Sequence, residues 1–304
     1  MKHIKLVIGA IGYHVFVKYL RITGNRPQVL DSEQTVKHIL HTKSSVSRYG
    51  DGELLWALQK RENGNFEKNS PLLAKRLQEI LRSKKENLAI CIPNVFNGLN
   101  TYKTDGKLYW EGFVIKRSFQ VLKIIPKDRI YYNSFFTRPY MDLKNKNEYD
   151  FETYFSLVRQ IWDNRNVLII EGEKTRFGMN NDLLCNVKST KRIICPSKNA
   201  FESYDEIISK TRNIANKIED PVILIALGPT ATVLAYDLSE EFQAIDIGHL
   251  DIEYEWYRMN AKEKRPVTGK YVSEVHRHFI SELPDLELTK YKSEIVAKIG
   301  GRSF

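Results

Sequence analysis

Short apolar runs alternate with amphipathic stretches along most of the chain. The apolar runs have the length and composition of buried strands and lie at residues 45–49, 88–92, 130–136, 167–170, 192–195, 222–227 and 244–247. The stretches between them space their apolar residues as helices do, at residues 31–40, 70–81, 110–125, 149–162, 201–218 and 231–238. This alternation predicts an α/β fold, with a single Rossmann-like, doubly wound, mostly parallel sheet and helices on both faces.

The length of 304 residues suits one such domain with short additions at each end. We expect an N-terminal helical extension over residues 1–30 and a main domain over residues 31–260. Residues 261–304 should form a basic loop and a C-terminal helix packed on that domain. The apolar stretch near the N-terminus is too short to span a bilayer and lacks a clear cleavage site. It is either a helix that packs on the rest of the protein or a segment that binds peripherally to a membrane face.

The balance of charge narrows the possible partners. The chain has 47 basic and 37 acidic residues, a net charge of +10, which favours phosphorylated metabolites, anionic membrane surfaces or nucleic acid. The basic residues are dispersed among acids without a known nucleic-acid motif, so we expect no nucleic-acid partner. The three cysteines are widely spaced, which favours free thiols in a reducing compartment. We therefore expect a cytoplasmic protein, with peripheral contact at the inner, anionic membrane face left open.

The first predicted strand leads into an acidic turn, Arg48-Tyr49-Gly50-Asp51-Gly52-Glu53. Asp51 and Glu53 would diverge on a helix but can converge on turn backbone, which the two glycines permit. Mg²⁺ and Mn²⁺ prefer oxygen ligands and keep positions open for water and phosphate. The turn therefore predicts a metal site for a diphosphate. In the alternative interpretation, Asp51 caps a helix and Glu53 is an ordinary acid of its first turn.

Other polar groups follow later strands, at the edge where open parallel sheets bind ligands. The candidates for binding a phosphorylated donor are Arg48, Arg138, Arg176, Asn181, Asp182, Gly228 and Thr230. Arginine forks suit phosphate, amide and carboxylate groups suit a sugar or base, and the glycine turn can present backbone amides at a helix start. A solvated loop, a structural ion pair and a tight strand-to-helix turn remain the simpler alternatives for these segments.

A carboxylate cluster follows the last predicted strand. It lies in the run Gly248-His249-Leu250-Asp251-Ile252-Glu253-Tyr254-Glu255-Trp256. In extended backbone the three acids share one face, whereas on a helix Asp251 and Glu255 align. The catalytic candidates are Asp251, Glu253 and His249, with an acid as general base toward an acceptor hydroxyl. A charged outer face over an aromatic stripe is the structural alternative.

Taken together, these segments resemble the bacterial glycosyltransferases of the GT-D fold, from about Asp31 to Glu274. The resemblance rests on the acidic turn, residues 137–142, Glu171-Gly172-Glu173, Asn181-Asp182-Leu183, residues 227–232 and residues 248–256. It implies a Rossmann-like fold and a nucleotide-sugar donor, typically linked to UDP. It also implies a Mn²⁺ or Mg²⁺ ion held through Asp51 and Glu53, and a glycan or glycoprotein acceptor.

Two other functions use the same features. A metal-dependent phosphohydrolase or nucleotidyltransferase would employ the same carboxylates and basic loops but release phosphate or pyrophosphate without sugar transfer. A non-catalytic module that binds anionic glycans or nucleic acid would rely on the positive charge alone. The transferase hypothesis further predicts that Arg48, Arg138 and the Gly228 turn offset the charge of the departing nucleotide diphosphate.

Overall fold

The structure is a computed structural model that describes residues 2–60, 67–275 and 282–300, with the backbone alone for residues 2–9. Within these residues, nine parallel strands form one sheet in the order β1-β4-β3-β2-β8-β7-β5-β6-β9. The strands are β1 (Gln28–Val29), β2 (Ser45–Arg48), β3 (Leu88–Ile92), β4 (Ile130–Asn133), β5 (Asn166–Gly172), β6 (Ser189–Cys195), β7 (Pro221–Ala226), β8 (Gln243–Asp246) and β9 (Ile295–Lys298). The predicted α/β fold is confirmed.

The described part of the chain also contains ten α-helices, nine of them between strands and α1 ahead of β1. They are α1 (Lys2–Ile22), α2 (Ser32–Thr42), α3 (Asp51–Ala57), α4 (Pro71–Leu81), α5 (Thr104–Ile124), α6 (Phe151–Arg159), α7 (Tyr204–Ala215), α8 (Pro229–Leu238), α9 (Leu250–Arg258) and α10 (Asp285–Glu294). The sequence sets several of their starts. Asp31 and Gln34 form a reciprocal capping box before α2, and Ser70 caps α4 ahead of a first-turn proline.

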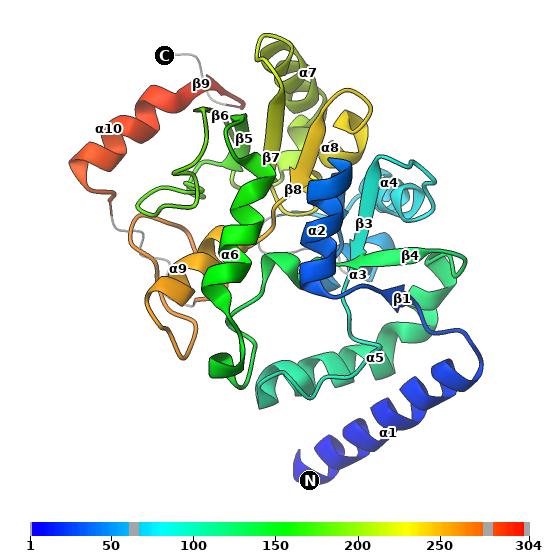
Figure 1. Cartoon of the computed structure of the whole chain (residues 1–304). Coiled ribbons are helices and arrows are strands. Elements are labelled where there is room, and N and C mark those ends of the chain that lie inside the picture. The colour runs from blue at the N-terminus through cyan, green and yellow to red at the C-terminus, as the bar shows by residue number, and fades with distance from the viewer. Residues whose placement is uncertain (1, 61–66, 276–281, 301–304) are drawn as a thin grey trace.

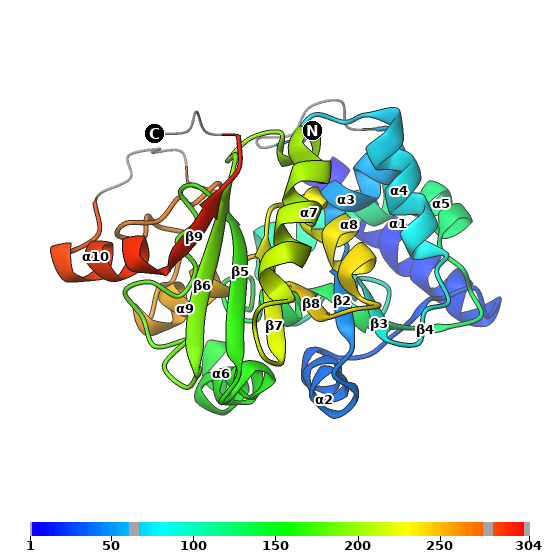
Figure 2. The ribbon, with the colours of Figure 1, turned by 90° about the horizontal axis from the view of Figure 1, so that it is seen from above.

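Helices cover both faces of the sheet. Figure 2 shows α2 and α6 on one side and α4, α7 and α8 on the other. Alternate residues of the central strands face opposite ways, so that Ile90 packs under α4 while Ala89 and Cys91 join the core beneath α2 and α6. After β2 the chain adds β3 and β4 on one side of β2. The later strands β5, β6, β7 and β9 lie on the far side of β8. The boundary between β2 and β8 is therefore a topological switch point.

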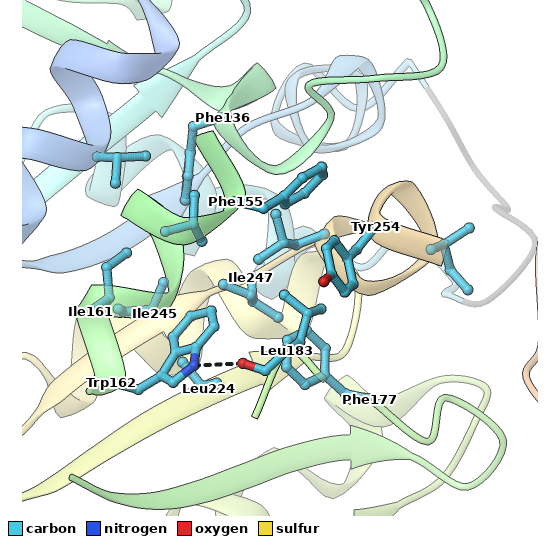
Figure 3. Close-up of a cluster of buried hydrophobic side chains, with 14 of the residues drawn as sticks. Phe136, Phe155, Ile161, Trp162, Phe177, Leu183, Leu224, Ile245, Ile247 and Tyr254 are labelled. Atoms are coloured by element: carbon cyan, nitrogen blue, oxygen red, sulfur yellow. Dashed lines mark hydrogen bonds between the residues drawn. The ribbon is translucent and has the colours of Figure 1, made fainter. Parts of the chain in front are cut away.

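The core beneath α2, α6 and α9 is rich in aromatic rings (Figure 3). Phe136, Phe155 and Trp162 pack there against Leu224 and other strand residues, and all are fully buried. The indole Nε1 of Trp162 donates a hydrogen bond to the Leu183 carbonyl at 2.9 Å, which satisfies its polar atom. This bond ties the loop after β5 to the layer that supports the sheet.

Several predicted boundaries are corrected. The strand expected to run to Phe136 ends at Asn133, and a 3₁₀ turn follows because the Asn133 side chain accepts a hydrogen bond from the Phe135 amide. The predicted terminal helix is α10, but the chain then forms β9, which pairs with β6 at the edge of the sheet (Figure 1). The two-residue strand β1 was also not predicted.

Helix α1 lies along α5, away from the sheet (Figure 1). Its inner face is anchored by Tyr13, whose hydroxyl donates to the Val95 carbonyl at 2.8 Å, and by buried Leu20. Among the described residues, none of the helices combines the length and apolar character needed to cross a bilayer.

Candidate active site

A cleft runs along the carboxyl ends of the central strands, where the topological switch point predicts a ligand site. It consists of two connected hollows. The β5/β7 hollow is lined by the turns after these strands, including Gly172, Phe177 and Gly228, and the α5 hollow by Tyr109 and other residues of α5 and neighbouring loops. The side chains common to both hollows are Arg48, Glu53, Trp56, His249 and Ser273.

Arg48, at the end of β2, lies where the two hollows meet. It is 9% exposed, and its Nε makes no hydrogen bond within the described part of the chain. The nearest carboxylate in an ion pair is that of Asp246, with 3.6 Å between Arg48 Nε and Oδ1. A buried guanidinium with an unused donor is costly in isolation, so this position favours an anionic ligand.

The acidic turn forms the first turn of α3, so the prediction that Asp51 and Glu53 lie on non-helical turn backbone is wrong. The N-cap is Gly50 rather than Asp51, so the alternative that Asp51 caps the helix is also wrong. Glu53 is an acid of the first turn, as that alternative held, and its Oε2 accepts a hydrogen bond from the Gly50 amide at 2.8 Å. Asp51 points instead toward α5, where it accepts a hydrogen bond from the Tyr109 hydroxyl. Both carboxylates nevertheless line the α5 hollow.

The donor set at this turn limits which cation fits. Within the described residues, no group of three or more His, Cys, Asp or Glu side chains is arranged to hold a metal. Asp51 and Glu53 therefore offer at most a two-carboxylate site. That set fits Mg²⁺ or Mn²⁺, which are commonly held by one or two carboxylates and complete their shell with water and substrate phosphate.

Arg138 also lines the α5 hollow, in a charged cluster. Its guanidinium binds Glu274 through two hydrogen bonds, of 2.5 Å and 3.1 Å, and Lys264 also pairs with that carboxylate. Burial alone would raise the pKa of Glu274, but Arg138 and its neighbours hold it well below the usual range. In this structure Arg138 therefore forms a structural ion pair, as the simpler alternative expects.

His249 lines both hollows, and Asp246 lines the β5/β7 hollow. Burial and the nearby Arg138 lower the pKa of His249 to about 4, so this ring is neutral at pH 7. Burial raises the pKa of Asp246 to about 7, although Arg48 opposes the shift. The Thr232 hydroxyl and the Gly248 amide donate to the Asp246 carboxylate. Asp246 is a cleft residue that the sequence reasoning missed.

Asp251 is at the margin of the β5/β7 hollow, but its carboxylate is fully engaged. Lys270 Nζ binds its two oxygens at 2.8 Å and 2.7 Å, and Glu255 at 3.0 Å. The Gly178 amide and the Asn181 side chain donate to the same carboxylate. The cluster run is the helix α9, and the alignment of Asp251 with Glu255 serves to hold this buried lysine.

Glu253 is fully buried beneath the wall of the cleft. Its Oε2 accepts hydrogen bonds from the Tyr140 and Met141 amides, at 2.9 Å and 2.8 Å. Burial raises the pKa of Glu253 to about 7, while Arg138 acts in the opposite direction. This geometry gives Glu253 the task of fixing the loop that carries Arg138, and the side chain does not line either hollow.

The remaining donor candidates are only partly brought together. Gly228 lines the β5/β7 hollow at the start of α8, and Thr230 behind it is buried and donates to Glu67. Arg176 lies outside both hollows and donates to the Gly269 carbonyl at 2.9 Å. Asn181 is bound to Asp251 and Glu255, and Asp182 is paired with Arg159 and Tyr254 on another side of α9. The structure therefore separates these three from the cleft.

Several lining residues had no clear signal in the sequence. Lys103, Asp105, Tyr109 and Trp110 come from the first turns of α5 or just before it, and Asp142 from the loop after β4. The helix was expected to begin only at Trp110, so its polar N-terminal turns were not recognised as part of a site. Asp246 had a usable signal, a carboxylate at the end of a buried strand.

A family model described as the glycosyltransferase GT-D fold matches residues 46–275. The matched span begins in β2 and ends directly after Glu274, so it contains all the side chains that line the two hollows.

Two longer streptococcal proteins are similar in sequence. The probable glycosyl transferase Gly of Streptococcus gordonii is 36% identical over 273 residues, which are 89% of this chain and 39% of that protein. Glycosyltransferase GlyD of Streptococcus pneumoniae is 31% identical over 274 residues, 90% of this chain and 32% of that protein. The chain thus spans about a third to two fifths of the length of the curated relatives it matches.

Solved structures share this fold over about nine tenths of the chain. One, described as the conserved domain of unknown function 1792 with a distinct glycosyltransferase fold, has a TM-score of 0.83 and 37% identity, covering 91% of this chain and 98% of that one. A second, a new glycosyltransferase of the same domain type from Streptococcus sanguinis, has a TM-score of 0.82 and 35% identity, covering 90% and 100%.

Proposed function

The chain belongs to the glycosyltransferase GT-D family, and from that premise we propose that it transfers a sugar from a nucleotide-diphosphate donor, a UDP-sugar, to a hydroxyl of a glycan or glycoprotein. The observation that carries the proposal is Arg48. This buried arginine, with an unused Nε donor, lies beside Glu53 where the two hollows join. A diphosphate spanning that junction would use the donor and offset the charge of the guanidinium.

In this proposal the diphosphate lies at the junction, the nucleoside occupies the β5/β7 hollow and the sugar points into the α5 hollow. The turn at Gly228, at the start of a helix, directs backbone amides toward anionic groups of the donor. Carboxylates and lysines of the α5 hollow suit the hydroxyls of a sugar and an acceptor. Neutral His249 adds a hydrogen-bonding group at the junction without adding charge.

We propose that Asp51 and Glu53 hold Mg²⁺ or Mn²⁺ against the diphosphate. The ion would supply Lewis-acid stabilisation of the departing nucleotide diphosphate. Arg48 would neutralise the same developing charge from the protein side. Because Lys270 saturates Asp251 and the protein encloses Glu253, we assign acceptance of the acceptor proton to a carboxylate of the α5 hollow instead.

Equilibrium binding and thermal unfolding test the proposal together. At a UDP-sugar concentration about 100 times Kd, mass action adds about 2.7 kcal/mol to the free energy of unfolding. With an unfolding entropy of about 2.1 cal/mol/K per residue, this raises Tm by about 4 °C for 304 residues. Arg48→Gln should abolish the shift with and without Mn²⁺, and Asp51→Asn with Glu53→Gln should abolish only its Mn²⁺-dependent part.

Asp182→Asn is the matched control, because Asp182 was a sequence candidate that the structure places outside the cleft. It should retain the full shift. A shift that survives Arg48→Gln, or is lost equally in Asp182→Asn, would refute the placement of the donor. Release of phosphate or pyrophosphate from the UDP-sugar, with no sugar transfer to any hydroxyl, would favour the hydrolase alternative.

A further inference from the structure

The outer faces of α1 and α5 form one exposed apolar surface, and its side chains do not line the cleft. On α1, Ile11, Val15, Tyr19 and Ile22 recur at helical spacing and are all exposed. On α5, Ile115 and Phe119 continue the surface. We call these six side chains the α1/α5 patch.

Contacts between the two helices make the patch continuous. The rings of Phe16 and Phe119 meet edge to face, with centroids 5.1 Å apart. Gly12 leaves room for Ile115, since a Cβ at that glycine would lie 3.2 Å from Ile115 Cδ1. Val15 and Phe119, which are 64% and 65% exposed, therefore belong to one surface that is not covered by the described part of the chain.

In the helical segments that carry the patch, the charged side chains are all basic. Lys18 and Arg21 on α1 and Lys116 and Lys123 on α5 are exposed beside it. Residues 10–22 and 112–124 contain no aspartate or glutamate. The wide apolar stripe with a cationic border is the composition that favours an anionic bilayer surface.

We propose that the α1/α5 patch is a docking surface for a membrane that contains anionic lipid, with both helices lying in the interface plane. A second copy of the chain fits this face less well. In a two-fold dimer the patch would meet itself, and the cationic border of one copy would oppose that of the other. The proposal is independent of the reaction that the cleft performs.

Vesicle co-sedimentation tests this surface. The wild-type chain should bind vesicles of phosphatidylglycerol and phosphatidylcholine, bind pure phosphatidylcholine far more weakly, and lose affinity as salt rises. Each basic residue near an anionic surface contributes about 1 kcal/mol, which is about fivefold in affinity. Lys18→Gln with Arg21→Gln should therefore weaken binding to the anionic vesicles by roughly 25-fold.

Val15→Asp with Phe119→Asp removes the apolar part, and we expect it to abolish sedimentation with the vesicles. Leu286→Asp is the matched control, because Leu286 is 81% exposed on α10, far from the patch. It should bind as the wild type does. Lys18→Gln with Arg21→Gln, and Leu286→Asp, should retain the wild-type Tm, whereas Phe119→Asp also removes the ring contact with Phe16 and should lower Tm slightly while the chain remains folded. Vesicle binding that is absent in the wild type, or equal in the Asp variants and the control, would overturn the proposal, as would a dimer in sedimentation analysis that these substitutions dissociate.

Discussion

Replacing Lys270 with methionine removes the cation from a buried cluster of one lysine and two carboxylates. The Lys270 side chain is fully buried, and both of its carboxylate partners, Asp251 and Glu255, are almost fully buried. Methionine keeps much of the apolar volume of lysine but leaves two carboxylates without a counter-charge. Breaking a buried pair in this way lowers the free energy of unfolding by about 3–5 kcal/mol.

This loss can be converted into a melting temperature. An unfolding entropy of about 2.1 cal/mol/K per residue over 304 residues means that a loss of 3–5 kcal/mol lowers Tm by about 5–8 °C. Calorimetry gives Tm directly, and urea unfolding gives the free energy. Lys37→Met is the matched control, because Lys37 pairs with Glu33 at 2.6 Å with both side chains largely exposed. Its Tm should equal that of the wild type.

A double mutant separates lost charge pairing from lost packing. If Lys270 acts as a counter-charge, Asp251→Asn should relieve part of the damage caused by Lys270→Met. The loss of free energy of unfolding in the double variant should then be smaller than the sum of the losses in the two single variants, by more than about 1 kcal/mol. A Lys270→Met variant that melts within about 1 °C of Lys37→Met, or losses that simply add, would refute the counter-charge argument.

Two further predictions concern Asp246 and Gly248, which line the β5/β7 hollow. The pKa of Asp246 is raised to about 7 by burial, so the folded chain holds a proton there that the unfolded chain loses above its ordinary pKa of 3.8. The contribution of Asp246 to the free energy of unfolding is therefore present at low pH and lost as pH rises toward 7. Between pH 4 and 7 the free energy of unfolding of the wild type should fall relative to that of Asp246→Asn. If urea unfolding gives the same difference between the two proteins at every pH, this prediction is wrong. Gly248→Ala places a Cβ 2.5 Å from Arg48 Nε at a φ of +50°, whereas Gly24→Ala, at a φ of +67°, meets no atom within 4 Å. Both should lose stability through backbone strain, but only Gly248→Ala should also weaken UDP-sugar binding, and equal binding in the two variants would refute the clash.

The sheet was predictable because each central strand is a short, continuous apolar run between turn residues. The run at residues 222–227 became β7, and its Gly-Pro turn began α8 as the spacing indicated. Strand β9 was not predictable from local pattern. It has four residues directly after a helix, and its place depends on pairing with the distant edge strand β6.

The site was less predictable than the fold, because strand ends are local features while loop directions depend on distant partners. Arg48 and Gly228 follow or end strands, and both reach the cleft. The loop after β5 instead folds back onto α9, where Gly178 and Asn181 bind Asp251. That direction depends on Lys270, a buried lysine about 90 residues further along the chain, in a segment whose basic composition predicts solvent exposure.

Different states of pairing distinguish the two arginines that face the cleft. Arg138 is held by two hydrogen bonds to Glu274, which Lys264 also binds, so an anion that approached it would first have to displace a carboxylate. The Nε of Arg48 lies 3.6 Å from Oδ1 of Asp246, its partner in an ion pair, and burial raises the pKa of Asp246 to about 7. Binding of a diphosphate at Arg48 therefore disrupts no existing hydrogen bond of its Nε, whereas binding at Arg138 exchanges one charge-assisted pair for another. The junction between the hollows is consequently where an anionic ligand gains most, and Arg138 is better suited to holding Glu274 and its segment against the α5 hollow.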